Sequence, residues 1–300
     1  MDRMVSRGGT GLVLGTVQWG MPYGIANRTG QPPVSQVMQI LDYAQAHGID
    51  TLDTARAYGE SEAVIGACAD AHWRIVTKLS PLLSSDAASP TELAQRSLVQ
   101  SRAALRRDRL EVLLLHRAEH RTAWDGRVWE LLQEQRHAGR IGKLGVSVGT
   151  PEEAWAALED PSVEAMQVAS SLFDQRLLRA GFFSAAAVRG VELFVRSVFL
   201  QGVAFLDPEQ LPPFLVELRP LLEELRALCS SLGLSLAAAC IHFARARFSA
   251  QLVLGAESLE QVQGFVQPEL EPHTQAALER FGSALPELSP QLLNPACWPK

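Results

Sequence analysis

The sequence has no long apolar run and few cysteines. None of its hydrophobic stretches approaches the roughly 20 residues of a membrane-spanning helix, and the opening MDRMVSRGGT lacks the apolar core of a signal peptide. Cys68, Cys229, Cys240 and Cys297 are far apart, and no CxxC pair or nearby histidine indicates a metal site. Four separate thiols fit a reducing compartment. We therefore expect a soluble cytoplasmic protein without a metal and without a membrane partner.

Basic residues are also in short supply. The chain has 27 Lys and Arg against 33 Asp and Glu, which gives a net charge of -6. A nucleic-acid-binding protein normally carries a basic patch, and the arginine-rich run Arg102–Arg109 lies on a predicted helix, where it fits a solvated face. We expect no nucleic-acid partner. The hydrophobic content of 47% is enough for one large core or two small ones.

Predicted strands and helices alternate along the chain. The strands are short and apolar, without the polar alternation of half-exposed strands, which indicates parallel strands buried on both faces. They are predicted at Leu12–Thr16, Thr51–Asp53, Arg74–Leu79, Val112–His116, Lys143–Val148, Ala165–Ala169, Val191–Val198 and Gln251–Ala256.

Helical periodicity and capping signals lie between these strands. Ser89-Pro90-Thr91-Glu92 and Thr150-Pro151-Glu152-Glu153 have the pattern of capping boxes with proline at the first helical position. Ser258-Leu259-Glu260-Gln261 caps a further helix. Helices are also predicted at Val34–His47, Ser61–Asp70, Trp124–Ala138, Phe182–Val188, Phe214–Leu232 and Leu236–Ala246.

Eight strand–helix units in about 250 residues predict a (β/α)8 TIM barrel, an α/β fold. An open doubly wound sheet is the alternative, but the turn after the first strand, LGTVQWGMPYG, contains no GxGxxG. No domain-scale linker interrupts the chain. We therefore expect a single domain over residues 1–300, in which residues 266–300 form an extra terminal helix and a tail.

Polar side chains end three consecutive strands. Asp53, Lys78 and His116 stand at the carboxyl ends of the second, third and fourth strands, where active sites of such barrels lie. Tyr58 follows in the loop after Asp53. Neighbouring strands are about 4.8 Å apart, so these strand ends are within reach of one another. Each residue alone fits a structural role, whereas their convergence on one rim favours catalysis.

The four residues have a common chemical logic. A lysine ammonium next to a tyrosine favours the phenolate, and an aspartate neutralises the buried lysine. His116 can donate a hydrogen bond to a substrate carbonyl oxygen. Such a site protonates the alkoxide that forms from a carbonyl, or deprotonates an alcohol, and it needs a separate hydride donor.

With these motifs, the sequence resembles the aldo-keto reductase superfamily over nearly its whole length. LVLGT, DTARAYG, VTK, LLLH and LGAESLEQV occur in the family's order and spacing. The resemblance implies that an aldehyde or ketone is reduced to an alcohol, or the reverse, with NADP or NAD as cofactor. It also implies roles for the four residues: Tyr58 as proton donor, Lys78 and Asp53 as its tuners, and His116 as the group that orients the carbonyl.

The resemblance further implies where an extended nicotinamide cofactor would lie. Gln167 and Ser147 match residues near the carboxamide, and Arg196 stands where members commonly stack a tyrosine on the nicotinamide, which a guanidinium can also do. The segment Ser197–Gly202 would wrap the pyrophosphate, with an ordinary glycine-containing loop as the alternative. The implied cofactor contacts are Thr16, Ser147, Gln167, Arg196, Ser197, Phe199, Gln201, Gly202, Gly255, Ala256, Glu257, Ser258 and Gln261.

The adenosine end departs from the family's pattern. Gly255, Ala256 and Ser258 fit a helix entry that favours an anion. However, Glu257 and Gln261 stand where an arginine or lysine usually holds the 2′-phosphate of NADP. We therefore expect weak discrimination between NADPH and NADH.

Residues near the rim bear on the substrate. Gln18, Arg56 and Arg117 give the rim a polar and charged character, which favours a small polar carbonyl or alcohol, for example a sugar-like aldehyde. Trp19 and Tyr23 would offer a flat wall for a sugar or an aromatic group equally. The alternative function is a cofactor-binding regulatory or interaction subunit with little turnover. The presence of all four catalytic residue types argues against that alternative.

Overall fold

The computed structural model describes residues 10–27, 30–82 and 88–299, and its eight parallel strands close into a barrel. Consecutive strands are neighbours around the barrel, and β1 closes it by pairing with β8. The strands are β1 (Leu12–Gly15), β2 (Thr51–Asp53), β3 (Arg74–Leu79), β4 (Leu110–Leu115), β5 (Ile141–Ser147), β6 (Ala165–Ala169), β7 (Glu192–Arg196) and β8 (Gln251–Gly255). The predicted (β/α)8 barrel is confirmed.

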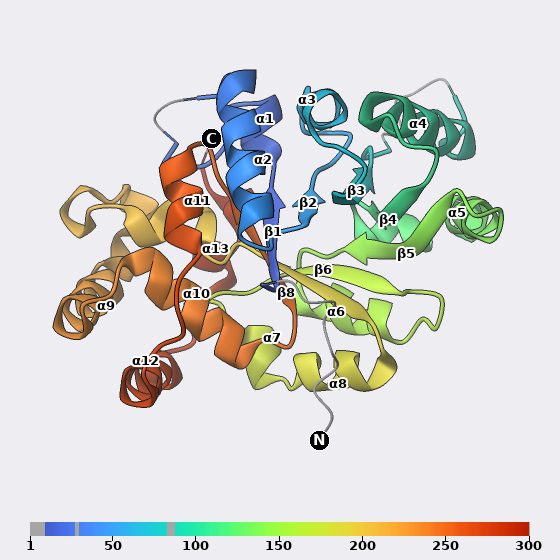
Figure 1. The fold of residues 1–300 in the computed structure, drawn as a ribbon. Helices are drawn as coiled ribbons and strands as arrows, with labels where there is room; N and C mark the ends of the chain where they lie inside the picture. The colour runs from blue at the N-terminus through green and yellow to red at the C-terminus, as the bar shows by residue number, and fades with distance from the viewer. Residues whose placement is uncertain (1–9, 28–29, 83–87, 300) are drawn as a thin grey trace.

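Helices surround the strands (Figure 1). The longer ones are α2 (Val34–Ala46), α3 (Ser61–Cys68), α4 (Pro90–Leu105), α5 (Arg127–His137), α6 (Pro151–Leu158), α8 (Phe182–Arg189), α9 (Arg219–Leu232), α10 (Leu236–Arg247), α11 (Leu259–Phe265) and α12 (Pro272–Ala284). Shorter helices are α1 (Val17–Gly20), α7 (Arg176–Arg179) and α13 (Pro290–Leu293). Over the described residues, no single helix is long and apolar enough to cross a membrane; one pair, Pro213–Leu232 with Leu236–Arg247, passes by length and composition but is bent by 93°.

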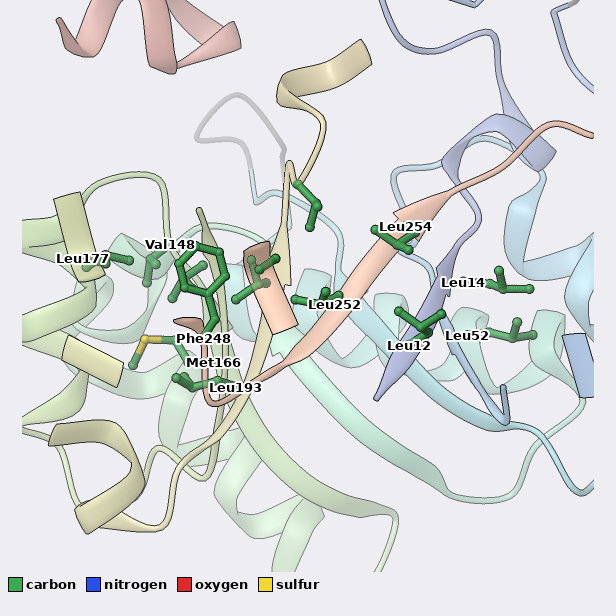
Figure 2. Close-up of a cluster of buried hydrophobic side chains, with 14 of the residues drawn as sticks. Leu12, Leu14, Leu52, Val148, Met166, Leu177, Leu193, Phe248, Leu252 and Leu254 are labelled. Atoms are coloured by element: carbon green, nitrogen blue, oxygen red, sulfur yellow. The ribbon is translucent and has the colours of Figure 1, made fainter. Parts of the chain in front are cut away.

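Side chains that alternate along each strand separate two apolar clusters. Those that point away from the barrel axis join the large core beneath the helices, and Figure 2 shows Leu12, Leu52 and Leu252 among them. Those that point inward form a second cluster, which fills the middle of the barrel. It consists of Val13, Val76, Val112, Leu114, Ala165, Phe194 and Val253. The barrel is therefore a packed core, and its two ends carry the polar groups.

A charged network forms the floor of the barrel, at the amino ends of the strands. The Glu192 carboxylate accepts hydrogen bonds from Arg74 at 2.6 and 2.8 Å, from Lys143 at 2.8 Å and from Gln251 at 2.7 Å. These residues come from β3, β5, β7 and β8, so one carboxylate joins four strands.

Helix starts differ from the prediction at two places. The helix predicted at Trp124–Ala138 begins at Arg127, because Trp124 and Asp125 have left-handed φ angles of 54° and 56° inside a 3-10 segment, η2 (Ala123–Gly126). The helix predicted at Phe214–Leu232 begins at Arg219, after the 3-10 segment η5 (Pro213–Leu218).

The capping predictions are confirmed at α4 and correct only in part at α6. Ser89 and Glu92 form both hydrogen bonds of a capping box. At α6 the Thr150 hydroxyl accepts from the Glu153 N–H at 3.3 Å, but the Glu153 carboxylate accepts instead from the Gly149 N–H at 2.6 Å. The reciprocal bond therefore reaches one residue further back than the motif predicts.

Candidate active site

The upper end of the barrel collects polar side chains by the same alternation. The inner apolar cluster includes Val76, Leu114, Ala165 and Phe194. In each of their strands, the next inward-pointing residue lies two positions after the residue in that cluster. Those positions hold Lys78, His116, Gln167 and Arg196, and the corresponding positions of β2 and β5 hold Asp53 and Ser147. The structure thus brings the predicted strand-end residues to one layer.

Lys78 and Asp53 form a buried ion pair at the centre of this layer. The ammonium donates to both Asp53 oxygens, at 2.7 and 2.9 Å, and to the Thr54 carbonyl at 2.9 Å. Gln167 donates to the same carboxylate at 2.7 Å. Burial alone would lower the pKa of Lys78, but the Asp53 charge and the neighbouring Tyr58 outweigh it and raise the pKa above its usual value. Lys78 is therefore a fixed cation at neutral pH.

Tyr58 and His116 lie beside this cation. The Lys78 ammonium is 5.0 Å from the centroid of the Tyr58 ring. The rings of Tyr58 and His116 meet edge to face, with centroids 5.9 Å apart and an interplanar angle of 87°. Burial, followed by the positive charges of Lys78, Arg196 and Arg117, lowers the pKa of His116 to about 4. Its imidazole is therefore neutral at pH 7 and has one N–H to donate.

The loop that carries Tyr58 is held on three sides. The Ser61 hydroxyl donates to the Thr16 carbonyl at 2.9 Å and lies 2.7 and 3.0 Å from the hydroxyls of Thr16 and Thr54. A Cβ on Gly20 would lie 1.9 Å from the Tyr58 carbonyl oxygen, so only glycine permits this approach of α1. The backbone around Tyr58 is therefore fixed by neighbours from β1, α1 and α3.

A second anchor uses a carboxylate. Glu62, on the first turn of α3, is fully buried and accepts from Arg56 at 2.7 Å and from the Thr77 hydroxyl at 2.7 Å. Arg56 is two residues before Tyr58, and Thr77 precedes Lys78 on β3. Sequence reasoning missed Glu62; the available signal was an acid in the first turn of an otherwise apolar helix.

An open cavity begins at Tyr58 and Asp53 and extends to α11. It contains about 970 Å³ of empty space, which includes the open solvent at its mouth. Ten of the thirteen predicted cofactor residues line it: Thr16, Gln167, Arg196, Ser197, Phe199, Gln201, Gly202, Gly255, Glu257 and Gln261.

The remaining three predicted cofactor residues lie outside its wall. Ser147 is buried in the polar layer. The Ala256 carbonyl accepts from the Trp19 indole at 3.0 Å, and the Ser258 hydroxyl caps α11 by accepting the Gln261 N–H at 3.2 Å.

The segment after β7 has an unusual backbone. Ser197, Leu200, Gln201 and Gly202 have φ angles of 64°, 46°, 53° and 93°. This conformation brings the segment to the loop that follows α1. Gln201 donates to the Tyr23 hydroxyl at 2.5 Å, and a Cβ on Gly202 would lie 2.7 Å from the Cβ of Ala26. Two loops that are far apart in the sequence therefore meet at the cavity.

The three predicted substrate residues lie in different surroundings. Tyr23 lines the cavity. Trp19 does not, and its prediction as a flat wall is wrong: α1 turns the side chain inward, where it is fully buried with its N–H held by Ala256. The Arg117 side chain is 54% exposed and lies 3.5 Å from Glu119, and it does not line the cavity, so its role toward a substrate stays a prediction.

Gln18, predicted only as a polar residue near the rim, contributes its side-chain amide to the cavity wall. Its Oε1 atom is buried and has no hydrogen-bond partner within the described chain, and the side chain packs on Gly255. A Cβ on Gly255 would come within 2.9 Å of the Gln18 amide. An unpartnered amide oxygen beside this close glycine contact fits a polar ligand along the β1–β8 wall. His116, directly after β4, also has a buried Nδ1 atom without a hydrogen-bond partner in the described chain.

No three His, Cys, Asp or Glu side chains of residues 10–27, 30–82 and 88–299 come together in a way that could hold a metal ion.

The cavity has the candidate proton-transfer residues at one end and extends toward α11 at the other. This arrangement fits an extended ligand that carries a reactive ring. A nicotinamide dinucleotide has this form, and Gln18, Gln167, Arg196, Gly202 and Gly255 are among the cavity residues that could hold it.

Comparisons with known proteins agree with this fold. Residues 11–282 match the model of the Aldo/keto reductase family. Oxidoreductase sirO of Leptosphaeria maculans is 29% identical over 140 residues, which span 45% of this chain and only 42% of that protein. A glycerol dehydrogenase from Gluconobacter oxydans aligns with a TM-score of 0.70 at 20% identity and covers 90% of both chains. The holo form of an aldo-keto reductase from Bacillus halodurans aligns with a TM-score of 0.70 at 19% identity over 90% of this chain and 91% of that one.

Proposed function

The chain belongs to the aldo/keto reductase family, and we propose that it is an oxidoreductase that interconverts a small polar carbonyl and its alcohol, with NADPH or NADH as the hydride donor. The observation that carries the proposal is the contact of Tyr58 with Lys78 and His116 at the head of the cavity. The four residue types expected for proton transfer are present and adjacent, in the layer where barrel enzymes place their chemistry.

In the proposed reaction, each of the four polar residues has a separate role. A carbonyl oxygen between Tyr58 and His116 receives a hydrogen bond from the neutral imidazole, which orients it and stabilises developing negative charge. When bound, the reduced nicotinamide supplies a hydride to the carbonyl carbon. The Tyr58 hydroxyl gives its proton to the oxygen, so that one hydride and one proton convert the carbonyl to an alcohol. The fixed ammonium of Lys78 stabilises the phenolate that remains, and Asp53 holds the ammonium in place.

Cofactor selectivity follows from the charges along the cavity. Arg196 is the only arginine or lysine that lines it among the residues described, and Glu257 lies toward α11. Two other arginines of this region are engaged elsewhere: Arg245 donates to the Thr10 carbonyl, and Arg247 lies 3.6 Å from Glu279. A 2′-phosphate would meet a carboxylate, whereas a ribose hydroxyl can donate to it. These features support weak discrimination between NADPH and NADH.

The test combines binding and turnover. NADPH and NADH are titrated by fluorescence at one ionic strength, and their oxidation is followed with a panel of small aldehydes and ketones. Tyr58→Phe should lose about 10²-fold or more in kcat, because it removes the positioned proton donor. Its cofactor affinity should be nearly unchanged, because the ring still packs.

Tyr43→Phe, on the outer helix α2, is the matched control and should behave as wild type. Near-normal turnover of Tyr58→Phe would exclude its role as the acid. Tight cofactor binding without turnover of any carbonyl would instead favour a regulatory subunit. A hundredfold preference for NADPH would overturn the assignment of the Glu257 end.

A further inference from the structure

We propose that the Arg196 guanidinium makes this cavity bind the reduced nicotinamide cofactor more tightly than the oxidised one. The inference rests on the proposed function, because it presupposes that a nicotinamide ring enters the cavity beside Tyr58. It assigns to Arg196 a role in setting the redox balance of the bound cofactor, in addition to shaping its pocket.

Arg196 is fixed in the cavity wall by neutral partners. It is the last residue of β7, occupies the inward position above Phe194 and pairs with Ala169 of β6. One terminal nitrogen donates to the Ser197 hydroxyl at 3.2 Å and the other to the Val148 carbonyl at 3.0 Å. Both acceptors are uncharged, so they orient the guanidinium without neutralising it.

No carboxylate of the described chain forms an ion pair with Arg196, in contrast to the other cation of the layer. Lys78 is neutralised by Asp53 at 2.7 Å. The remaining acid of the cavity wall, Glu257, lies at the α11 end, away from Tyr58. The deep end of the cavity therefore carries one uncompensated positive charge.

The charge of Arg196 acts to lower the pKa values of two neighbouring side chains. After burial and Lys78, Arg196 is the next cause that lowers the pKa of His116 to about 4. It also opposes the rise that burial and Tyr58 impose on the pKa of Tyr23. Tyr23 and Tyr58 line the cavity, and the His116 ring contacts Tyr58, so a ring bound beside Tyr58 would lie within the electrostatic field of Arg196.

The two redox states of the cofactor differ in this space by one charge. The oxidised nicotinamide ring is a cation and the reduced ring is neutral, while both states carry the same phosphates and riboses. Like charges about 4 Å apart repel by an amount that corresponds to roughly fivefold in affinity even at the dielectric constant of water, and to more in a drier site. The ratio of the two dissociation constants isolates this effect, because contacts with the shared groups cancel.

Tighter binding of the reduced cofactor affects the direction in which the bound reaction runs. If the enzyme holds the reduced cofactor more tightly, the equilibrium between bound reactants shifts toward alcohol oxidation by the same factor. The site then opposes part of the thermodynamic preference for carbonyl reduction and brings the two bound states closer in free energy.

The experiment measures the dissociation constants of NADH, NAD⁺, NADPH and NADP⁺ by tryptophan fluorescence or calorimetry. Wild type is compared with Arg196→Gln and Arg196→Met, which remove the charge, and with Arg196→Lys, which keeps it. The ratio of the oxidised to the reduced constant should fall about fivefold in the two uncharged variants. It should stay near the wild-type value in Arg196→Lys.

A structural defect would weaken both redox states together and leave the ratio unchanged. An unchanged ratio in the uncharged variants therefore overturns the role of Arg196 and leaves the proposed function standing. If wild type binds no nicotinamide dinucleotide in any state, the proposed function itself fails. Two uncharged variants are included so that a folding failure of one leaves the other to decide.

Discussion

The Lys78 ammonium is almost completely buried, and Asp53 is its only charged partner among the residues that the structure describes. Replacing Lys78 with methionine removes the cation but leaves the carboxylate buried, with Gln167 as its remaining side-chain donor. An unpaired buried charge is destabilising by roughly 3–5 kcal/mol. We expect Lys78→Met to lose that amount of unfolding free energy in urea denaturation, together with most of its activity.

A double variant separates the lost pair from lost packing. Lys78→Met combined with Asp53→Asn leaves no buried charge, so it should be more stable than Lys78→Met alone. If the single substitution changes the unfolding free energy by less than about 1 kcal/mol, the pair is hydrated and Asp53 is not the tuner of Lys78.

Residue-level reasoning from the sequence succeeded where strand alternation determines direction. Asp53, Lys78, His116 and Gln167 are at strand ends, so a buried strand with a known inner face fixes where they point. Trp19 and Arg117 lie in loops or in a single helical turn, where no periodicity fixes direction. An indole that finds a carbonyl at Ala256 goes into the core, and an arginine beside Glu119 stays at the surface.

The loop between β2 and α3 carries Tyr58, the proposed proton donor. Its backbone is tied at both ends, since the Tyr58 N–H donates to Ala55 and the Arg56 N–H to Lys78, each at 3.0 Å. Glu62 adds a side-chain anchor through Arg56 and Thr77. The carboxylate therefore acts as a positioning residue that holds the loop against β3.

Glu62→Gln should keep the hydrogen bond from Thr77 and lose the charge that holds Arg56. We expect a loss of about 1–2 kcal/mol in unfolding free energy, limited because Arg56 stays partly hydrated. We expect kcat to fall roughly tenfold through misplacement of Tyr58, with unchanged dinucleotide affinity. The exposed Glu60→Gln is the matched control on the same loop. Equal kcat for both variants would limit Glu62 to a purely structural role.

Whole elements were predictable to the extent that local signals determine them. Apolar runs placed all eight strands, and Ser89 with Glu92 placed the start of α4. The left-handed backbone of Trp124 and Asp125 was not predicted, because Trp124 is a bulky residue that rarely adopts positive φ, although aspartate is enriched in that region. The positive φ angles of Leu200 and Gln201 were not predicted either. They accompany a tertiary contact, the hydrogen bond from Gln201 to Tyr23 in the loop after α1.

Across the whole molecule, the inside of the barrel is divided into three levels. The middle level is apolar and seals the barrel, the upper level holds the proposed chemistry, and the lower level holds the network of Glu192. The sequence shows the upper level through its motifs. The lower level remained unrecognised, since Arg74, Lys143 and Glu192 each look like an isolated charge at the start of a strand. Only closure of the barrel brings them together.

The floor network makes a prediction about acid stability. Burial would raise the pKa of Glu192, but hydrogen bonds from Arg74 and Lys143, and then their charges, lower it to about 2 from its usual 4.5. A carboxyl whose pKa is depressed in the folded state stabilises the fold above its unfolded pKa, and this contribution is lost as the pH falls from about 4.5 toward 2. The shift corresponds to about 3 kcal/mol. Glu192→Gln should therefore be less stable than wild type at pH 7 by about that order, and the difference should shrink as the pH falls from 5 to 3.

Urea denaturation across this pH range measures the difference directly, and the exposed Glu130→Gln on α5 is the control that should show little of it. Because the apolar level separates the floor from the site, cofactor binding by Glu192→Gln should match wild type at pH 7. A stability difference that stays constant with pH would mean that packing of the side chain, and not its charge, joins the four strands. A parallel loss of cofactor affinity would show that the two ends of the barrel are coupled through the apolar level.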